Sequence, residues 1–205
     1  MTIEFFHDVL CAWCYAFSPR VRKLVEEFPE IQVIHRAFPL APEPISISEM
    51  FGSKERGKEE ILKHWEAANI NDDQHRINTQ LMMTKDFDYP YSTPGLLACK
   101  AAEKQGGQAM HWDYFDRLQK AHLSECRNIA DKEVLLDVAR ELGLNMEQFE
   151  KDMESKETMQ ALQEDIERAM ELGVSATPTL VANGHSLAGA VSYQRLRNWY
   201  LSLAT

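Results

Sequence analysis

The sequence predicts an α/β fold in which a large all-helical segment is inserted between a βαβ half and a ββα half. Three observations support this prediction. Strand-like runs lie near the two ends of the chain, apolar residues recur with helical spacing through most of residues 48–172, and 205 residues suit one domain that carries a large insertion.

The N-terminal part shows the order strand, helix, strand. Residues 3–10 form a short run rich in Phe and aliphatic side chains, which predicts a buried strand. A helix is expected from about residue 11 to 28. Pro19 lies inside it and removes the hydrogen bond to the Tyr15 carbonyl, so we expect a kink there. Residues 31–38 alternate apolar and polar side chains and predict a second strand.

The middle of the chain predicts helices after an irregular connector rich in proline. Asp131 and Asn145 occupy expected N-cap positions, and Gly143 stands where a helix should end. Near the C-terminus, Asn183-Gly184 favours a tight turn between two strands, and residues 192–203 predict a closing helix. The clearest helical segments of the middle part are residues 58–68, 94–104, 110–122, 132–142 and 159–172.

Composition excludes several classes of partner. The net charge is -10, from 32 acidic and 22 basic residues, which disfavours a nucleic-acid or anionic-membrane surface. The N-terminus has no basic signal-peptide region, and no apolar run is long enough to span a bilayer. We therefore expect a cytoplasmic protein, in which a cycling disulfide is more plausible than a structural one. The sequence does not indicate the oligomeric state.

Cys11 and Cys14 form a Cys-x-x-Cys pair where the first strand ends and the first helix begins. The free N–H groups and the positive dipole end of a helix start stabilise a thiolate there, which makes it a nucleophile. Residues three apart on a helix face the same way, so a disulfide between them is geometrically easy. The pair predicts a reversible dithiol/disulfide couple.

Two alternatives for this pair are half of a zinc site and two incidental cysteines. Zinc usually needs a second close pair of ligands, and only Cys99, Cys126 and scattered histidines remain, so no metal site is predicted. Cys99 lies in an apolar helical stretch and is expected to be buried, whereas Cys126 in its polar surroundings is expected to be more exposed.

Four further residues should surround the reacting sulfur. Ala12 and Trp13 lie between the cysteines and carry no charge. Thr177-Pro178 precedes the third strand, where proline cannot donate to the sheet. Taken alone, an ordinary trans bond is the simpler interpretation of this dipeptide. Together with the N-terminal motif, we expect a cis bond that exposes the Thr177 backbone to substrate.

These two motifs, residues 3–15 and 173–180, together resemble the DsbA-like branch of the thioredoxin superfamily, and most of all its FrnE-type oxidoreductases. The resemblance covers nearly the whole chain. It implies a thioredoxin fold formed by residues 1–44 and 173–205, interrupted by a helical insertion domain of residues 45–172. It also implies a thiol–disulfide oxidoreductase, comparable to a protein disulfide isomerase, with thiol or disulfide substrates.

The resemblance assigns roles to individual residues. Cys11 would be the nucleophile, Cys14 the resolving thiol and Pro178 the cis-proline. The family often has proline where this chain has Ala12 and valine where it has Thr177, and both positions tune reduction potential and substrate preference. Related folds often hold a carboxylate in the first strand beneath the disulfide, so Glu4 is a candidate proton relay whose pKa burial would raise.

The resemblance implies no bound cofactor and no metal, with glutathione able to serve as a co-substrate. A rival class is a glutathione-dependent enzyme similar to kappa-class glutathione transferases or 2-hydroxychromene-2-carboxylate isomerases, which usually bear a serine nucleophile and lack the paired cysteines. A third class is a non-catalytic binding module. Its groove in the insertion would be lined by Met50, Phe51, Met82, Met83, Phe87 and Tyr89, although ordinary core packing also explains these residues.

Overall fold

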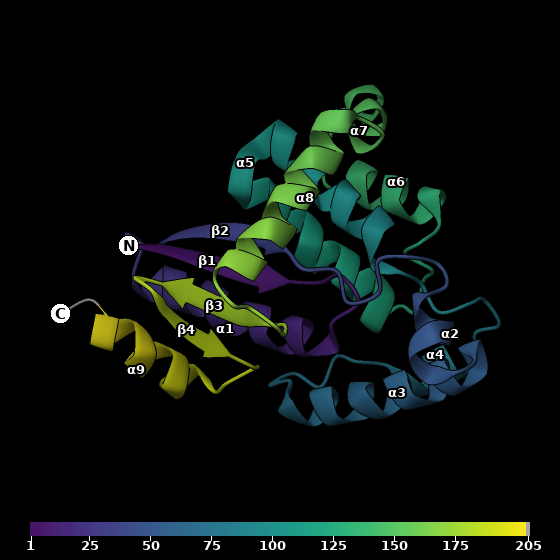
Figure 1. The fold of residues 1–205 in the computed structure, drawn as a ribbon, viewed down its shortest axis with the longest axis horizontal. Coiled ribbons are helices and arrows are strands. Elements are labelled where there is room, and N and C mark those ends of the chain that lie inside the picture. Colours follow the sequence, from purple (N-terminus) through teal and green to yellow (C-terminus); the bar gives the residue numbers. More distant parts are fainter. Residues whose placement is uncertain (204–205) are drawn as a thin grey trace.

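A computed structural model describes residues 1–203. Four strands form one mixed sheet in the order β2-β1-β3-β4 (Figure 1). β1 is parallel to β2 and antiparallel to β3, and β3 is antiparallel to β4. The predicted fold class is therefore confirmed, with a helical block between the second and third strands. The strand bounds are β1 (Thr2–His7), β2 (Gln32–Ala37), β3 (Thr179–Ala182) and β4 (His185–Ala188).

The helices cover both faces of the sheet (Figure 1). α1 and α9 pack together on one face, and α8 crosses the other beside β2. α5 contacts α1, α8 and β2, so helices of the insertion share a core with the sheet. Their bounds are α1 (Ala12–Glu27), α2 (Ser46–Phe51), α3 (Lys54–Asn71), α4 (Thr79–Met83), α5 (Ser92–Leu123), α6 (Lys132–Glu141), α7 (Met146–Met153), α8 (Lys156–Glu171) and α9 (Tyr193–Leu203).

The alternation of strand side chains separates the two faces of the sheet. Ile3 and Phe5 belong to the large core with α1 and α5, whereas Phe6 packs with Val181 and Ala169 of α8. Each large apolar side chain buried in this way contributes about 1.5–3 kcal/mol. The face of β1 that carries Ile3 and Phe5 is therefore the one that packs against α1 and α5.

α1 runs as one helix across Pro19, and the kink expected there stays a prediction. The Tyr15 carbonyl, which Pro19 leaves without a helical donor, accepts a hydrogen bond of 2.8 Å from Nη2 of Arg76. The Arg76 guanidinium also lies 3.9 Å from the Tyr15 ring centroid and pairs with Asp72 at 2.9 Å. A side chain 61 positions away thus satisfies the carbonyl.

Most predicted local signals have the expected geometry. Asp131 and Asn145 accept hydrogen bonds from the first turns of α6 and α7 as N-caps. Asn183 and Gly184 have positive φ values of 50° and 76°, as a tight hairpin turn requires. The short helices α2 and α4 were not predicted individually. α5 contains non-helical residues Gly106 and Gly107, and therefore corresponds to the two helices expected on either side of them.

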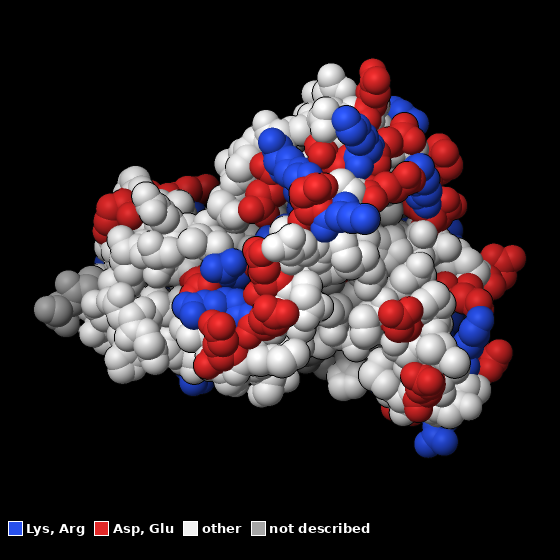
Figure 2. Space-filling model, turned by 45° about the horizontal axis from the view of Figure 1, so that its top comes forward, with Lys and Arg blue, Asp and Glu red and all other residues white. Residues whose placement is uncertain are grey.

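Charged side chains of both signs are intermixed over the helical upper part of the face shown in Figure 2.

The division at residues 44/45 and 172/173 into two domains stays a prediction. No helix within residues 1–203 is both long enough and apolar enough to cross a membrane.

Candidate active site around Cys11 and Cys14

Cys11 is the N-cap residue of α1, and Cys14 lies one turn further along the helix. The Cys11 sulfur accepts a hydrogen bond of 3.2 Å from the backbone N–H of Cys14. Both cysteines are free thiols, and Cys11 is 5% exposed whereas Cys14 is fully buried. The geometry places Cys11 as the accessible member of the pair.

The loop before β3 completes the surroundings of Cys11. The Thr177–Pro178 peptide bond is cis, and the Thr177 carbonyl oxygen lies 3.7 Å from the Cys11 sulfur, which donates to it. Because β3 pairs antiparallel with β1, the start of β3 and the end of β1 meet at the same edge of the sheet. Cys11 and Thr177, 166 positions apart in the sequence, therefore lie side by side.

The environment of Cys14 holds it as a thiol. Burial is the largest cause and the hydrogen-bonded Cys11 side chain the next, and together they raise the pKa of Cys14 well above its usual value. A resolving thiol with this property becomes reactive only when a base at the site accepts its proton.

The turn that carries Cys11 is fastened from behind by α5. The side-chain amide of Gln119 donates to the carbonyls of Asp8 and Cys11 at 3.2 and 2.9 Å. The Asp8 carboxylate accepts from the Leu10 N–H at 3.1 Å and so shapes the turn. It also accepts from the N–H of Leu40 and the hydroxyl of Ser92, both at 2.6 Å, and so joins the turn to the connector after β2 and to the start of α5.

Asp8 should make the stability of the protein depend on pH, and an Asn side chain at this position, which does not titrate, should not. Burial raises the pKa of Asp8 to about 6, although hydrogen bonds from Ser92, Leu40 and Leu10 oppose the shift. A raised carboxyl pKa means that the native state binds the proton more tightly than the unfolded chain. Its contribution is therefore most favourable at low pH and decreases as the pH rises from about 4 to about 6.

We expect the free energy of unfolding of the wild type, relative to Asp8→Asn, to fall by about 3 kcal/mol over this interval, at about 1.4 kcal/mol per pKa unit, and to stay level above it. Urea denaturation of both proteins at pH 4, 5, 6 and 7 measures this difference. A difference that does not change with pH would contradict the assignment.

An apolar groove of about 360 Å³ opens beside Cys11. No Lys, Arg, Asp or Glu lines it. Tyr89 is one of its lining residues, and its hydroxyl accepts from Trp65 at 3.1 Å and contacts His122 at 3.0 Å. The groove is lined by Leu10, Cys11, Ala12, Trp13, Leu40, Ala41, Ile47, Met50, Phe51, Ile61, His64, Trp65, Tyr89, Ser175, Ala176 and Thr177.

Ala12, Trp13 and Thr177 all border this groove, as the sequence motifs led us to expect, whereas Pro178 itself is not part of the lining. Three of the six residues predicted for a groove in the insertion, namely Met50, Phe51 and Tyr89, are present in it. The other three are not. Met82 is fully buried, Met83 borders a separate depression beside α3, and Phe87 packs against the core.

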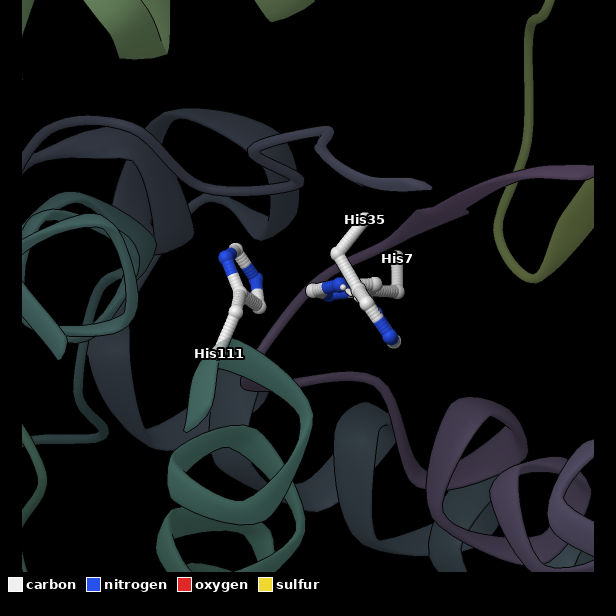
Figure 3. Close-up of side chains that lie close together, drawn as sticks. All are labelled: His7, His35 and His111. Atoms are coloured by element: carbon white, nitrogen blue, oxygen red, sulfur yellow. Dashed lines mark hydrogen bonds between the residues drawn. The ribbon is translucent and has the colours of Figure 1, made fainter. Parts of the chain in front are cut away.

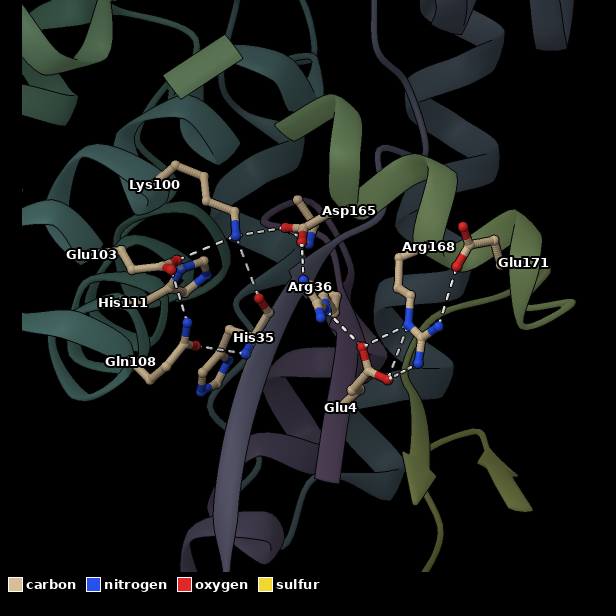
Figure 4. A network of polar contacts seen from close by, with 11 residues as sticks. Glu4, His35, Arg36, Lys100, Glu103, Gln108, His111, Asp165, Arg168 and Glu171 are labelled. Carbon is tan, nitrogen blue, oxygen red and sulfur yellow. Dashed lines mark hydrogen bonds and ion pairs between the residues drawn. The ribbon is translucent and has the colours of Figure 1, made fainter. Parts of the chain in front are cut away.

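Glu4 does not have the predicted properties of a proton relay (Figure 4). Its carboxylate accepts from Arg36 at 2.7 Å and from Arg168 at 2.8 Å. Burial acts to raise the pKa of Glu4, but the hydrogen bonds from Arg168 and Arg36 outweigh it and the pKa is lowered. Glu4 lies on the face of β1 that α8 covers, opposite the face that carries Ile3 and Phe5. The prediction of a raised pKa at this position is wrong.

The two other cysteines are inert side chains of the core. Cys99 is buried as predicted, and burial raises its pKa. The prediction of greater exposure for Cys126 is wrong, since it is 1% exposed, donates to the Asn78 carbonyl at 3.2 Å, and has its pKa raised to about 11 by burial. His7 is fully buried and bonded to His35, so it is a packed histidine.

The chain matches the family described as DSBA-like thioredoxin domain over residues 2–200. It is 31% identical to the ClpXP adapter protein SpxH of Bacillus subtilis (strain 168) over 191 residues, which cover 88% of this chain and 57% of that protein. Two further SpxH proteins, of Bacillus licheniformis and Halalkalibacterium halodurans, are covered to 64% and 58%. The chain thus spans less than two thirds of the length of these relatives.

Two solved structures have the same fold across the whole chain. The cytosolic disulfide reductase DsbM from Pseudomonas aeruginosa superposes with a TM-score of 0.73 at 21% identity, covering 100% of this chain and 97% of that one. A 2-hydroxychromene-2-carboxylate isomerase superposes with a TM-score of 0.69 at 18% identity, covering 100% and 95%. At these identities the likenesses establish the fold and leave the chemistry to the residues of the site.

Proposed function

Because the chain belongs to the DSBA-like thioredoxin family, we propose that this oxidoreductase exchanges thiols and disulfides through Cys11 and Cys14. The observation that carries the proposal is the position of the Cys11 sulfur. It caps α1, accepts the Cys14 N–H at 3.2 Å and borders the groove next to the Thr177 carbonyl. Cys11 is the nucleophile and Cys14 the resolving thiol.

The exchange proceeds in two balanced steps. The Cys11 thiolate attacks a substrate disulfide, so that a Cys11–substrate disulfide forms and one substrate sulfur leaves as a thiolate. That basic thiolate takes the proton of Cys14, whose sulfur then attacks Cys11 and releases the second substrate sulfur. Two electrons pass from the dithiol to the substrate, and a Cys11–Cys14 disulfide remains. The reverse sequence oxidises a substrate dithiol, and the reduction potential of the pair sets the direction.

The groove favours substrates with apolar groups beside the reacting sulfur. Its lining carries no Lys, Arg, Asp or Glu side chain, so peptides or small thiols with apolar neighbours fit it better than strongly charged ones. Ala12 and Trp13 contact the substrate from one side of Cys11, and the Thr177–Pro178 loop contacts it from the other. Glutathione serves as a co-substrate that restores the dithiol, in a cytoplasmic setting.

Reduction of insulin by a small-molecule dithiol tests the proposal. The wild-type chain accelerates the reaction, and Cys11→Ser loses the acceleration because no sulfur is left to form the mixed disulfide. Cys99→Ser is the matched control, since it removes a buried thiol outside the motif and the groove and should keep the activity. Equal rates for the wild type and Cys11→Ser would reject the proposal.

A second candidate function, binding without catalysis, is favoured by apolar side chains at the rim of the groove. Leu40 and Met50, which line the groove, are 42% and 53% exposed, and the Bacillus relatives are named as adapters. Suppression of the aggregation of an unfolded client by a variant that lacks both Cys11 and Cys14 would support this candidate. Loss of that suppression together with the oxidoreductase activity would count against it.

A further inference from the structure

Three histidines from distant parts of the sequence meet in the core between the sheet and α5 (Figure 3). His7 ends β1, His35 lies in β2 and His111 in α5, and all three side chains are fully buried. One nitrogen of each ring lies within 4.8 Å of a nitrogen of each other ring. The cluster takes no part in the groove beside Cys11.

The protein supplies too few hydrogen-bond partners for these rings. Nε2 of His7 and Nδ1 of His35 share one hydrogen bond of 3.1 Å, and Nδ1 of His111 lies 2.7 Å from the Glu103 carboxylate. The other nitrogen of each ring has no partner among residues 1–203. A buried polar atom without a partner costs about 1–3 kcal/mol, and an ion at the cluster would take one of these three nitrogens, Nε2 of His111.

The rings are in the form that binds metal. Burial is the main cause that lowers the pKa of His7, His35 and His111, and it therefore favours the neutral imidazole, which has one lone pair per ring. Positive charge close by does not exclude a cation. The Lys100 ammonium is neutralised by two carboxylates, at 3.2 Å from Glu103 and 2.6 Å from Asp165.

We propose that His7, His35 and His111 bind Zn²⁺. Neutral imidazole nitrogens are preferred ligands of this ion, and three of them leave one position for a small ligand. The bond from His111 Nδ1 to the Glu103 carboxylate fixes the tautomer and leaves Nε2 free for the metal. A carboxylate is a usual outer partner of a zinc-bound histidine. The ion joins β1, β2 and α5 immediately before the turn that carries Cys11.

Binding requires the rings to move inward, because their nearest nitrogens lie up to 4.8 Å apart. Two nitrogens on one tetrahedral zinc ion lie about 3.3 Å apart. Nε2 of His7 and Nδ1 of His35 already have this spacing, at 3.1 Å, and the ion replaces the proton that they share in their hydrogen bond. The His35 and His111 rings are nearly parallel, at 19° with centroids 5.0 Å apart, so His111 must turn until its free nitrogen points at the ion.

The test uses the 205-residue chain with Cys11 and Cys14 both replaced by Ser, so that thiolates of the motif cannot hold zinc. Zinc is added to the native protein and, separately, during refolding from urea, because the rings are sealed from solvent. After dialysis, metal analysis gives the zinc content, and a thermal melt gives the midpoint with and without zinc. The same measurements are made on His35→Gln, His111→Gln, Glu103→Gln and the exposed control His185→Gln, each checked for its helical circular dichroism.

We expect one zinc ion per chain and a higher melting midpoint with zinc, both unchanged in His185→Gln and lost in His35→Gln and His111→Gln. Glu103→Gln should keep the site but weaken its affinity by about 10- to 100-fold. Absence of bound zinc in the parent protein by both routes would overturn the proposal. So would zinc that His35→Gln or His111→Gln retains in full, or a melting midpoint that zinc does not raise.

Discussion

Cys14→Ser is expected to abolish turnover and to accumulate a covalent mixed disulfide between Cys11 and the substrate. The physical reason is that Cys11 keeps its position at the start of α1 and can still attack, whereas the serine hydroxyl at position 14 cannot displace the substrate sulfur. We expect the rate of insulin reduction to fall by at least about 100-fold, as is usual when an essential nucleophile is removed. Intact-protein mass spectrometry without reductant detects the adduct.

Two controls make the trapping experiment specific. Cys11→Ser in the Cys14→Ser background should give no adduct, because no reactive thiol of the motif remains. Cys126→Ser in the same background should leave the adduct unchanged, since Cys126 is buried and donates to the Asn78 carbonyl. An adduct mapped by peptide mass to a cysteine other than Cys11 would contradict the assigned nucleophile.

The second large effect is expected from Asp165, which lies at the centre of the polar network in Figure 4. Its carboxylate is 1% exposed, pairs with Arg36 at 3.0 Å and Lys100 at 2.6 Å, and accepts the Ala37 N–H at 2.9 Å. Asp165→Ala leaves a buried ammonium and a backbone N–H without this partner. We expect a loss of about 3–5 kcal/mol in the free energy of unfolding.

Urea denaturation measures this loss, with Glu164→Ala as the neighbouring control. Glu164 is an exposed residue of the same helix, so its removal should change stability by less than about 0.5 kcal/mol. Comparable losses for the two variants would show that Asp165 contributes through helix formation and not through its ion pairs. The contacts of Asp165 join α8 to β2 and α5, so the loss should also appear as reduced cooperativity of the transition.

The sequence by itself determined the features that depend on neighbours along the chain. Periodicity predicted the strands and most helices, Asp131 and Asn145 predicted helix starts, and Asn183-Gly184 predicted the hairpin turn, because each of these signals acts within a few residues. The pair Cys11 and Cys14 was recognisable for the same reason, since a helix start and a spacing of three are local properties.

Only the tertiary structure decided which distant side chains meet. Glu4 became an ion-paired carboxylate because β1 places it beneath Arg168 of α8, and Cys126 was buried because its segment packs against the chain at Asn78. Gln119 and the histidine cluster gave no sequence signal, since their partners are 28 to 111 positions away. The physical reason is that the sheet joins the two ends of the chain and α5 lies across it. The electrostatic environment of each buried group is therefore set by residues that periodicity and motif spacing do not relate.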